Sequence, residues 1–260
     1  MSFQYNNTPI EIRKIKSVNL KRGTVIDGFP STCLTNTIAS QCFINSLKTE
    51  LVAVLDSPGF PGLSIIHNAI PTFPARIYAN EDLKLSIFVS ELNLDQTMHY
   101  SISKIILQWA IENECELIIS AAGIPISQEN TVVSSAAELK TEKSNEVETH
   151  VFAAASTTRA VERLANAGVP ALSNGSVTGI AALLLNEGLW MNFDVIVLLV
   201  KVLKDVPDFR AAAALSETIS KLIPGASCDI AVLLQEAAQI EKSLRKIKNE
   251  QTDPDVRIYR

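Results

Sequence analysis

Cysteine and histidine are scarce in this sequence: its 260 residues include four cysteines and three histidines. No CxxC pair occurs and the histidines lie far apart, so the chain lacks the ligand spacing of a zinc site. Disulfide frameworks are typical of small secreted domains, whereas a chain of this length can bury a large hydrophobic core. We therefore predict no metal site and buried thiols at Cys33, Cys42, Cys115 and Cys228.

Long apolar runs and an excess of basic charge are missing as well. The formal net charge is -5 and the sequence pI is about 5.3, so the chain has no general attraction for nucleic acid or for anionic membranes. The longest apolar run, near Val195 to Val200, is too short to cross a bilayer. Residues 1–20 mix polar and charged side chains, unlike a signal peptide. We expect a cytoplasmic protein that binds neither nucleic acid nor membrane.

The common catalytic motifs are absent. The sequence contains no G-x-G-x-x-G, no Walker P-loop and no G-x-S-x-G nucleophile elbow. His67 and His99 have no evident serine or cysteine partner. Asp205 and Asp208 follow the most apolar strand and could form a metal or acid/base pair, but an aspartate at this point more simply caps the next helix. We predict no catalytic residue and no cofactor.

What the sequence does contain is an alternation of short apolar runs with longer segments of helical period. Hydrophobic residues make up 47% of the chain and charged residues 20%, as in folded globular proteins. The alternation predicts a three-layer α/β/α fold with a mostly parallel central sheet. The expected strands are 24–27, 51–55, 75–78, 85–89, 117–120, 151–155, 170–172 and 194–201. The expected helices are 32–47, 97–113, 157–167 and 174–186, with an exposed charged loop at 137–149.

The last third of the chain predicts a helical hairpin. Apolar residues recur at helical spacing from Ala212 to Leu222 and again from Ile230 to Ile247, and Pro224-Gly225 separates the two stretches. Ser227 or Asp229 is placed to cap the second helix. The hairpin packs either on the core or on a neighbouring subunit. We therefore divide the chain into an α/β core domain (1–206), the hairpin (207–248) and a polar tail (249–260).

Several turns at strand ends are rich in glycine and proline. In an open parallel sheet such turns gather at the carboxyl edge, where small molecules usually bind, and a turn that opens a helix can present backbone N–H groups to an anion. Glycine and proline also punctuate tight turns whatever the function of the protein. The candidate ligand-binding residues are Gly28, Gly59, Gly62, Gly123, Asn174 and Gly175.

The chain ends in Ile258-Tyr259-Arg260, after a polar stretch that begins at Asn249. These three residues fit a hydrophobic–tyrosine–any residue (HbYX) pattern. Such an end can bury its aromatic ring in a pocket while the terminal carboxylate meets a cation. Residues 249–257 could extend about 30 Å, which is enough to reach a pocket on another molecule.

Five stretches together resemble the archaeal branch of the proteasome assembly chaperone 2 family. They begin at Asp27-Gly28-Phe29-Pro30, Leu55-Asp56-Ser57-Pro58, Ile70-Pro71-Thr72-Phe73, Asn174-Gly175-Ser176 and Asp205-Val206-Pro207-Asp208, in the order of the family. The resemblance implies a nucleoside-phosphorylase-like fold and a homo-oligomeric chaperone or activator of the proteasome rather than an enzyme. It also implies that Ile258 and Tyr259 enter a pocket between α subunits of the core particle, where the Arg260 carboxylate meets a lysine.

Two hypotheses follow from the sequence. The first is a non-catalytic factor that docks its C-terminus onto the proteasome core particle. The alternative is a small-molecule-binding enzyme or sensor of nucleoside-phosphorylase-like fold that uses the glycine-proline turns. Ser31-Thr32-Cys33 stands where many relatives continue with glycine, which weakens a phosphate-binding role for the first turn. In a third hypothesis, the helical hairpin alone mediates assembly and the tail has no role in it.

Overall fold

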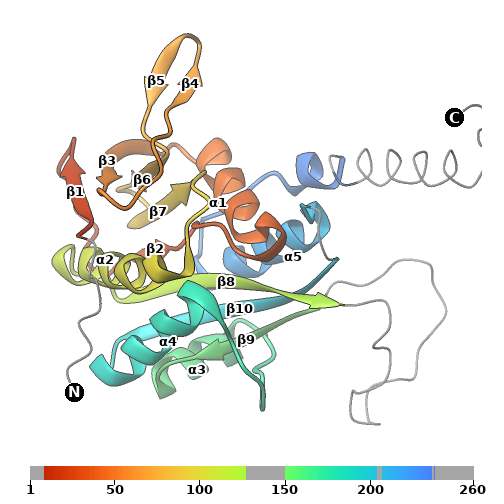
Figure 1. Cartoon of the computed structure of the whole chain (residues 1–260). Coiled ribbons are helices and arrows are strands. Elements are labelled where there is room, and N and C mark those ends of the chain that lie inside the picture. Colours follow the sequence, from red (N-terminus) through yellow and green to blue (C-terminus); the bar gives the residue numbers. More distant parts are fainter. Residues whose placement is uncertain (1–8, 127–149, 204–206, 236, 238–260) are drawn as a thin grey trace, which may run out of the picture.

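The computed structural model describes residues 9–126, 150–203, 207–235 and 237 (Figure 1). The strands are β1 (Glu11–Lys14), β2 (Thr24–Ile26), β3 (Glu50–Asp56), β4 (Ile65–His67), β5 (Ile70–Thr72), β6 (Ala75–Asn80), β7 (Leu85–Ser90), β8 (Leu117–Ile126), β9 (Val151–Ala155) and β10 (Asp194–Leu203). The α-helices are α1 (Thr35–Ser46), α2 (His99–Glu112), α3 (Thr158–Asn166), α4 (Gly179–Met191) and α5 (Phe209–Leu222).

Within the described residues, eight strands form one sheet in the order β1-β3-β6-β7-β2-β8-β10-β9. The four neighbours β7, β2, β8 and β10 are parallel. Strand β6 runs antiparallel to both β7 and β3, so β3 points the same way as the parallel group. Antiparallel β1 and β9 close the two edges. The prediction of an α/β fold with a mostly parallel sheet is confirmed.

Strand β10 shows why helices cover both faces of the sheet. Successive side chains of a strand point to opposite faces, and all six residues from Val195 to Val200 are buried. Val195, Val197 and Leu199 pack in one cluster with α2 and α4, whereas Ile196, Leu198 and Val200 pack in another with α1, α3 and α5. A strand buried on both faces reads as a continuous apolar run, which is how the sequence revealed it.

Helix α2 follows the predicted stripe closely. Met98, Ile102, Ile105 and Trp109 are all buried, as expected from their spacing. The indole N–H of Trp109 donates to Ser86 Oγ at 3.1 Å, and the ring meets Phe88 edge-on with centroids 6.2 Å apart. This contact fixes α2 on the parallel part of the sheet.

The first predicted helical stretch of the C-terminal third is present, and the second lies within the described residues only at 230–235 and 237. Helix α5 packs its buried face into the same core cluster as α1 and β10, so this helix lies on the core of its own chain. The chain turns at Pro224-Gly225, where Gly225 has a φ of +86°. Residues 230–235 and 237 are helical, and Asp229 Oδ1 caps them by accepting from Ala231 N–H at 3.0 Å. The domain limits at 206 and 248 stay a prediction.

Other predicted elements differ from the structure. Strand β8 continues past Gly123-Ile124-Pro125 to Ile126 because it pairs with β10 over its whole length, so these residues are not a turn. Residues 170–172 make one bridge, between Ala171 and Ala153, and the helix expected at 174 begins at Gly179. Edge strand β1 and the β4–β5 hairpin were not predicted, and loop 137–149 lies outside the described residues.

Candidate functional site

The predicted docking residues Ile258, Tyr259 and Arg260 lie outside the described residues. The other candidates are the glycine turns, which the structure does place. In the described ranges, no helix is long and apolar enough to traverse a bilayer, and no group of three or more His, Cys, Asp or Glu side chains is arranged to hold a metal ion.

Gly28 lies where the chain leaves β2 and passes between β7 and α1. A Cβ atom at this position would stand 2.1 Å from the carbonyl oxygen of Phe88 and 2.6 Å from Ser40 Oγ. Asn36 Nδ2 donates to the carbonyl of Phe29 at 3.3 Å, and the Phe29 ring is itself buried. The turn is thus filled by its own chain, and glycine is required there by close packing.

Asp27, just before this turn, is the most perturbed carboxyl group of the region. Its side chain is 2% exposed. It accepts hydrogen bonds from Ser120 Oγ at 2.6 Å and from the Phe29 N–H at 3.0 Å. Burial raises the pKa of Asp27 to about 6, against the opposing effect of these hydrogen bonds. The carboxyl group ties β2 to β8 and closes the turn, a role that the sequence signalled only by an aspartate directly after a buried strand.

The structure brings Gly123 to the same place. A Cβ on Gly123 would lie 2.8 Å from the carbonyl oxygen of Thr32 and 3.0 Å from Val202. The turn after β2 therefore rests directly on β8, and the lack of a side chain at Gly123 leaves room for it. Glycine serves packing at this position.

The turn after β3 is held by its own polar contacts. Ser57 Oγ donates to the carbonyl of Pro9 at 2.8 Å and accepts from the Gly59 N–H at 3.2 Å. A Cβ on Gly62 would meet nothing within 4 Å, so Gly62 borders open space. The turn leads into the β4–β5 hairpin, which projects from the body of the protein (Figure 1).

Asn174 and Gly175 line a hollow of about 420 Å³ beside α4. Gly28, Gly59, Gly62 and Gly123 line neither this hollow nor a second one beside α5. The lining residues of the first hollow carry no charge; they are Ala154, Leu172, Ser173, Asn174, Gly175, Val177, Ala182, Leu185 and Asn186. The hollow therefore offers amide and hydroxyl groups to a ligand but no side-chain cation to a phosphate.

The structure also places two polar side chains that the sequence singled out, Asp208 and His99. Asp208 Oδ1 accepts from the Ala211 N–H at 2.9 Å and caps α5, which confirms the predicted cap, while Asp205 lies outside the described residues. Partial burial lowers the pKa of His99, opposed by the nearby Asp95 carboxylate.

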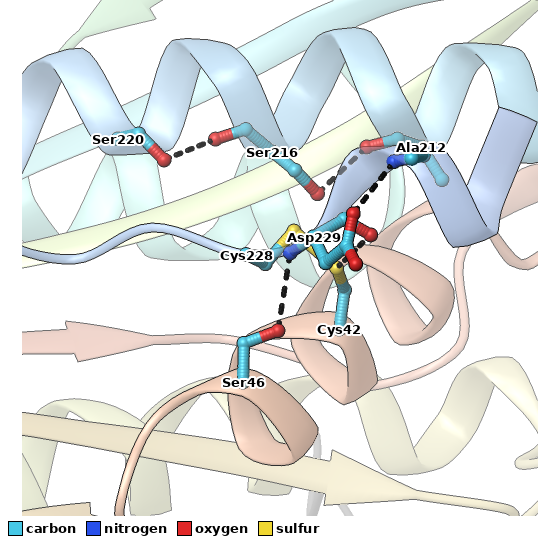
Figure 2. Close-up of a disulfide and its surroundings, with 8 residues drawn as sticks. Cys42, Ser46, Ala212, Ser216, Ser220, Cys228 and Asp229 are labelled. Carbon is cyan, nitrogen blue, oxygen red and sulfur yellow. Dashed lines mark hydrogen bonds between the residues drawn. A yellow bond between two sulfur atoms is a disulfide. The ribbon is translucent and has the colours of Figure 1, made fainter.

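The prediction of four buried thiols is wrong for Cys42 and Cys228, which are not thiols, and Cys33 is a thiol that is only half-buried. Cys42 on α1 and Cys228 form a disulfide across 186 residues of sequence, with their Cα atoms 5.6 Å apart (Figure 2). The packing of α1 beside α5 brings the two cysteines together, and no spacing in the sequence encodes that proximity. Cys115 keeps a buried thiol, whose pKa burial raises to about 12.

Two groups of large apolar side chains are exposed on the described surface. Ile66 and Ile70 belong to the β4–β5 hairpin, and Leu189, Trp190 and Met191 form the last turn of α4. Trp190 is 86% exposed. Large apolar side chains that are exposed side by side in the sequence, as at 189–191, are candidates for a contact with another protein.

The fold is that of a three-layer α/β protein in which the glycine turn after β2 is packed by its own chain and rests on Gly123 of β8. Comparison with known sequences gives the family: the sequence model of the PAC2 family matches residues 25–248, and the chain belongs to this family. An uncharacterized protein of Methanocaldococcus jannaschii is 27% identical over 230 residues, which are 88% of this chain and 87% of that protein.

Solved structures of relatives have the same fold. Pyrococcus furiosus PbaA, an archaeal homolog of proteasome-assembly chaperone, is 27% identical, with a TM-score of 0.77 over 94% of this chain and 93% of PbaA. P. furiosus PbaB, an archaeal proteasome activator, is 22% identical, with a TM-score of 0.75 over 93% of this chain and 99% of PbaB. At this lower identity the likeness to PbaB concerns the fold alone.

Proposed function

We propose that this protein is a non-catalytic factor that binds the proteasome core particle and either assists its assembly or activates it. Membership of the PAC2 family, together with the likeness to PbaA over nearly the whole length of both chains, carries this proposal. The two carboxyl groups described above have structural roles, because Asp27 is enclosed and Asp208 caps a helix.

The proposed contact with the core particle is the C-terminal tripeptide. Ile258 and Tyr259 would fill an apolar pocket between α subunits, and the terminal carboxylate of Arg260 would pair with a lysine there. Because the last position of the HbYX pattern admits any residue, the Arg260 side chain contributes little, whereas the position of the carboxylate is essential.

We further propose that several chains act together as a homo-oligomer. The exposed apolar residues of the β4–β5 hairpin and of the last turn of α4 support this, since a subunit contact would remove them from water. Several tails on one oligomer would engage the α ring at once and multiply a weak single-tail affinity. The mass of the particle in solution, for the wild type and for Trp190→Glu, tests this part.

Binding to purified core particle tests the docking mode. Deleting residues 258–260, or appending one glycine after Arg260, is expected to abolish binding, because either change removes or displaces the carboxylate and the aromatic ring. Arg260→Ala is the matched control and is expected to bind like the wild type. Full binding by the deletion variant would exclude tail docking; circular dichroism of each variant checks that the domain stays folded.

The alternative small-molecule hypothesis is tested by thermal unfolding with nucleosides, nucleotides and inorganic phosphate. A ligand that binds the folded chain raises Tm by mass action. We expect no shift, because Gly28 and Gly123 are close-packed by their own chain and the hollow at Asn174 and Gly175 has no side-chain cation for a phosphate. A shift in Tm that disappears when the loop from Gly59 to Gly62 is mutated would favour the enzyme or sensor instead.

A further inference from the structure

The segment after Pro224 is held on the protein by few non-covalent contacts. Of the described residues between Cys228 and Gln235, only Leu233 is fully buried, and Cys228 and Ile230 are half-buried against the core. Val232 and Leu234 are 52% and 40% exposed. Ala226 and Ala237 add two small buried side chains at the ends of the segment. Such a segment has a low free energy of local opening compared with the sheet.

The disulfide lies at the point where this segment meets α1. Figure 2 shows Cys228 and Asp229 between α5 on one side and α1 on the other. The Asp229 N–H donates to Ser46 Oγ at 3.1 Å, and the Cys42 sulfur lies 3.8 Å from the Asp229 carbonyl oxygen. Ser46 and Asp229 are exposed, so water competes for this hydrogen bond. Beside the packing of Ile230 and Leu233 on the core, the covalent bond is therefore the strongest single attachment of the start of the last helix.

The two sulfur atoms differ in their surroundings. Cys42 is 8% exposed, whereas Cys228 is only half-buried. Helix α5 itself packs through Ala212, Leu215 and Ile219, which do not depend on the disulfide. Cleavage of the bond would therefore free the segment beyond Pro224 and leave the two faces of the sheet packed.

We propose that the Cys42–Cys228 disulfide is a redox latch that fixes the segment 226–235 on α1, and with it the position from which the chain continues toward its C-terminus. In the oxidised form the segment is held; in the reduced form it detaches while the α/β core stays folded. The consequence for proteasome binding rests on the function proposed above, but the latch itself does not.

The reductant is a dithiol, such as dithiothreitol or a thioredoxin-type protein. One of its thiolates attacks the half-buried sulfur of Cys228, the Cys42–Cys228 bond breaks and a mixed disulfide forms. The second thiolate of the reductant then displaces Cys228. The reductant leaves as its own disulfide, two electrons pass to the protein, and Cys42 and Cys228 take up protons from water as thiols.

Hydrogen exchange of the full chain, with and without dithiothreitol, tests the latch. Reduction is expected to speed amide exchange over 226–235 by about tenfold or more, with the exchange of β8 and β10 unchanged. Cys228→Ser is expected to show the reduced pattern in both conditions. The matched control Cys33→Ser, which leaves the disulfide intact, is expected to respond to the reductant like the wild type.

Three outcomes would overturn the latch. The first is equal exchange over 226–235 in the two redox states. The second is faster exchange throughout the sheet on reduction, because the disulfide would then hold the whole fold. The third is that peptide mapping finds Cys42 and Cys228 as thiols in protein that was purified without a reductant.

Core-particle binding in the two redox states tests the effect on function. A fixed base restricts where the tail can go, which lowers the entropy lost on docking, so reduction is expected to weaken binding by about tenfold. Deletion of 258–260 is expected to abolish binding in both states. Equal binding of the reduced and oxidised wild type would overturn the regulation. Absence of binding in every form would refute the proposed function and leave the latch to be decided by exchange.

Discussion

The sheet and the C-terminal segment are stabilised in different ways. In β10 every side chain from Val195 to Val200 is buried between two helical layers. Between Cys228 and Gln235 one side chain is fully buried, and a disulfide supplies the strongest single attachment. The first region has many contacts that each specify the same arrangement, whereas the second has few contacts and one bond that a reductant can break. Evenly distributed packing gives a fixed scaffold, and a single attachment gives a segment that can be switched.

The largest expected effect concerns the scaffold, which is the central sheet with the helices packed on its two faces. Ile106→Ala removes a fully buried side chain of α2 and is expected to lower the free energy of unfolding by about 2–5 kcal/mol, through lost burial and a residual cavity. Ile111→Ala, on the same helix but 44% exposed, is expected to change it by about 0.5 kcal/mol or less. Urea unfolding measures both. Equal effects of the two substitutions would contradict the packing described for α2.

The second test uses pH. The pKa of Asp27 is about 6 in the folded chain and has its ordinary value of 3.8 in the unfolded chain. The folded state therefore binds the proton more tightly, so the contribution of Asp27 to stability is largest below about pH 4 and is lost as the pH rises to about 6. Relative to Asp27→Asn, which cannot ionise, the wild type is expected to lose about 3 kcal/mol of unfolding free energy between pH 4 and 7.

Unfolding curves of both proteins at several pH values measure this difference. Asp82→Asn, an exposed site, is the control and should leave the pH profile of the wild type unchanged. A constant difference between wild type and Asp27→Asn at all pH values would show that Asp27 does not titrate in this range.

The third test compares two glycines of the candidate ligand turns. Gly28→Ala places a methyl group against the Phe88 carbonyl and Ser40 and is expected to destabilise the protein by about 1–3 kcal/mol. Gly62→Ala enters open space and is expected to be near neutral. Thermal unfolding measures both. If Gly28→Ala were also neutral, the turn would have to be looser than its contacts indicate.

The smallest expected effects on stability come from two helix caps, one on either side of Pro224. Asp208→Ala removes the cap of α5 and is expected to cost about 1 kcal/mol of global stability. Asp229→Ala removes the cap of the last helix and is expected to speed exchange over 230–235 alone, with the global unfolding curve unchanged. A matching loss of global stability in Asp229→Ala would mean that the C-terminal segment is part of the scaffold.

The sequence predicted the scaffold well where burial leaves a period. The apolar run of β10 results from burial of the strand on both faces. The apolar stripe on α2 results from burial of one face of the helix. Strand β1 was missed because an edge strand exposes most of its side chains: Glu11, Arg13 and Lys14 are exposed and Ile12 is half-buried. The β4–β5 hairpin was missed because its strands have three residues each, too few for an alternation to be recognised.

The candidate site was predicted less completely. Glycines in the expected turns were candidate ligand-binding residues, but the sequence did not show which of them serve packing. Only the approach of Phe88 to Gly28, and of Thr32 to Gly123, shows that these glycines serve packing. The tail pattern Ile258-Tyr259-Arg260 was read from the sequence alone and stays a prediction.

The sequence by itself determined most of the central strands and helices and the two-faced burial of β10, because these depend on the local period of apolar residues. Five sequence stretches, rather than this period, indicated the family. Tertiary structure alone decided that Cys42 meets Cys228, that Asp27 is sealed against Ser120 and that Gly123 supports the turn after β2. Each of these contacts joins residues far apart in the chain. Their distance depends on how helices and strands pack together, and no spacing along the sequence records it.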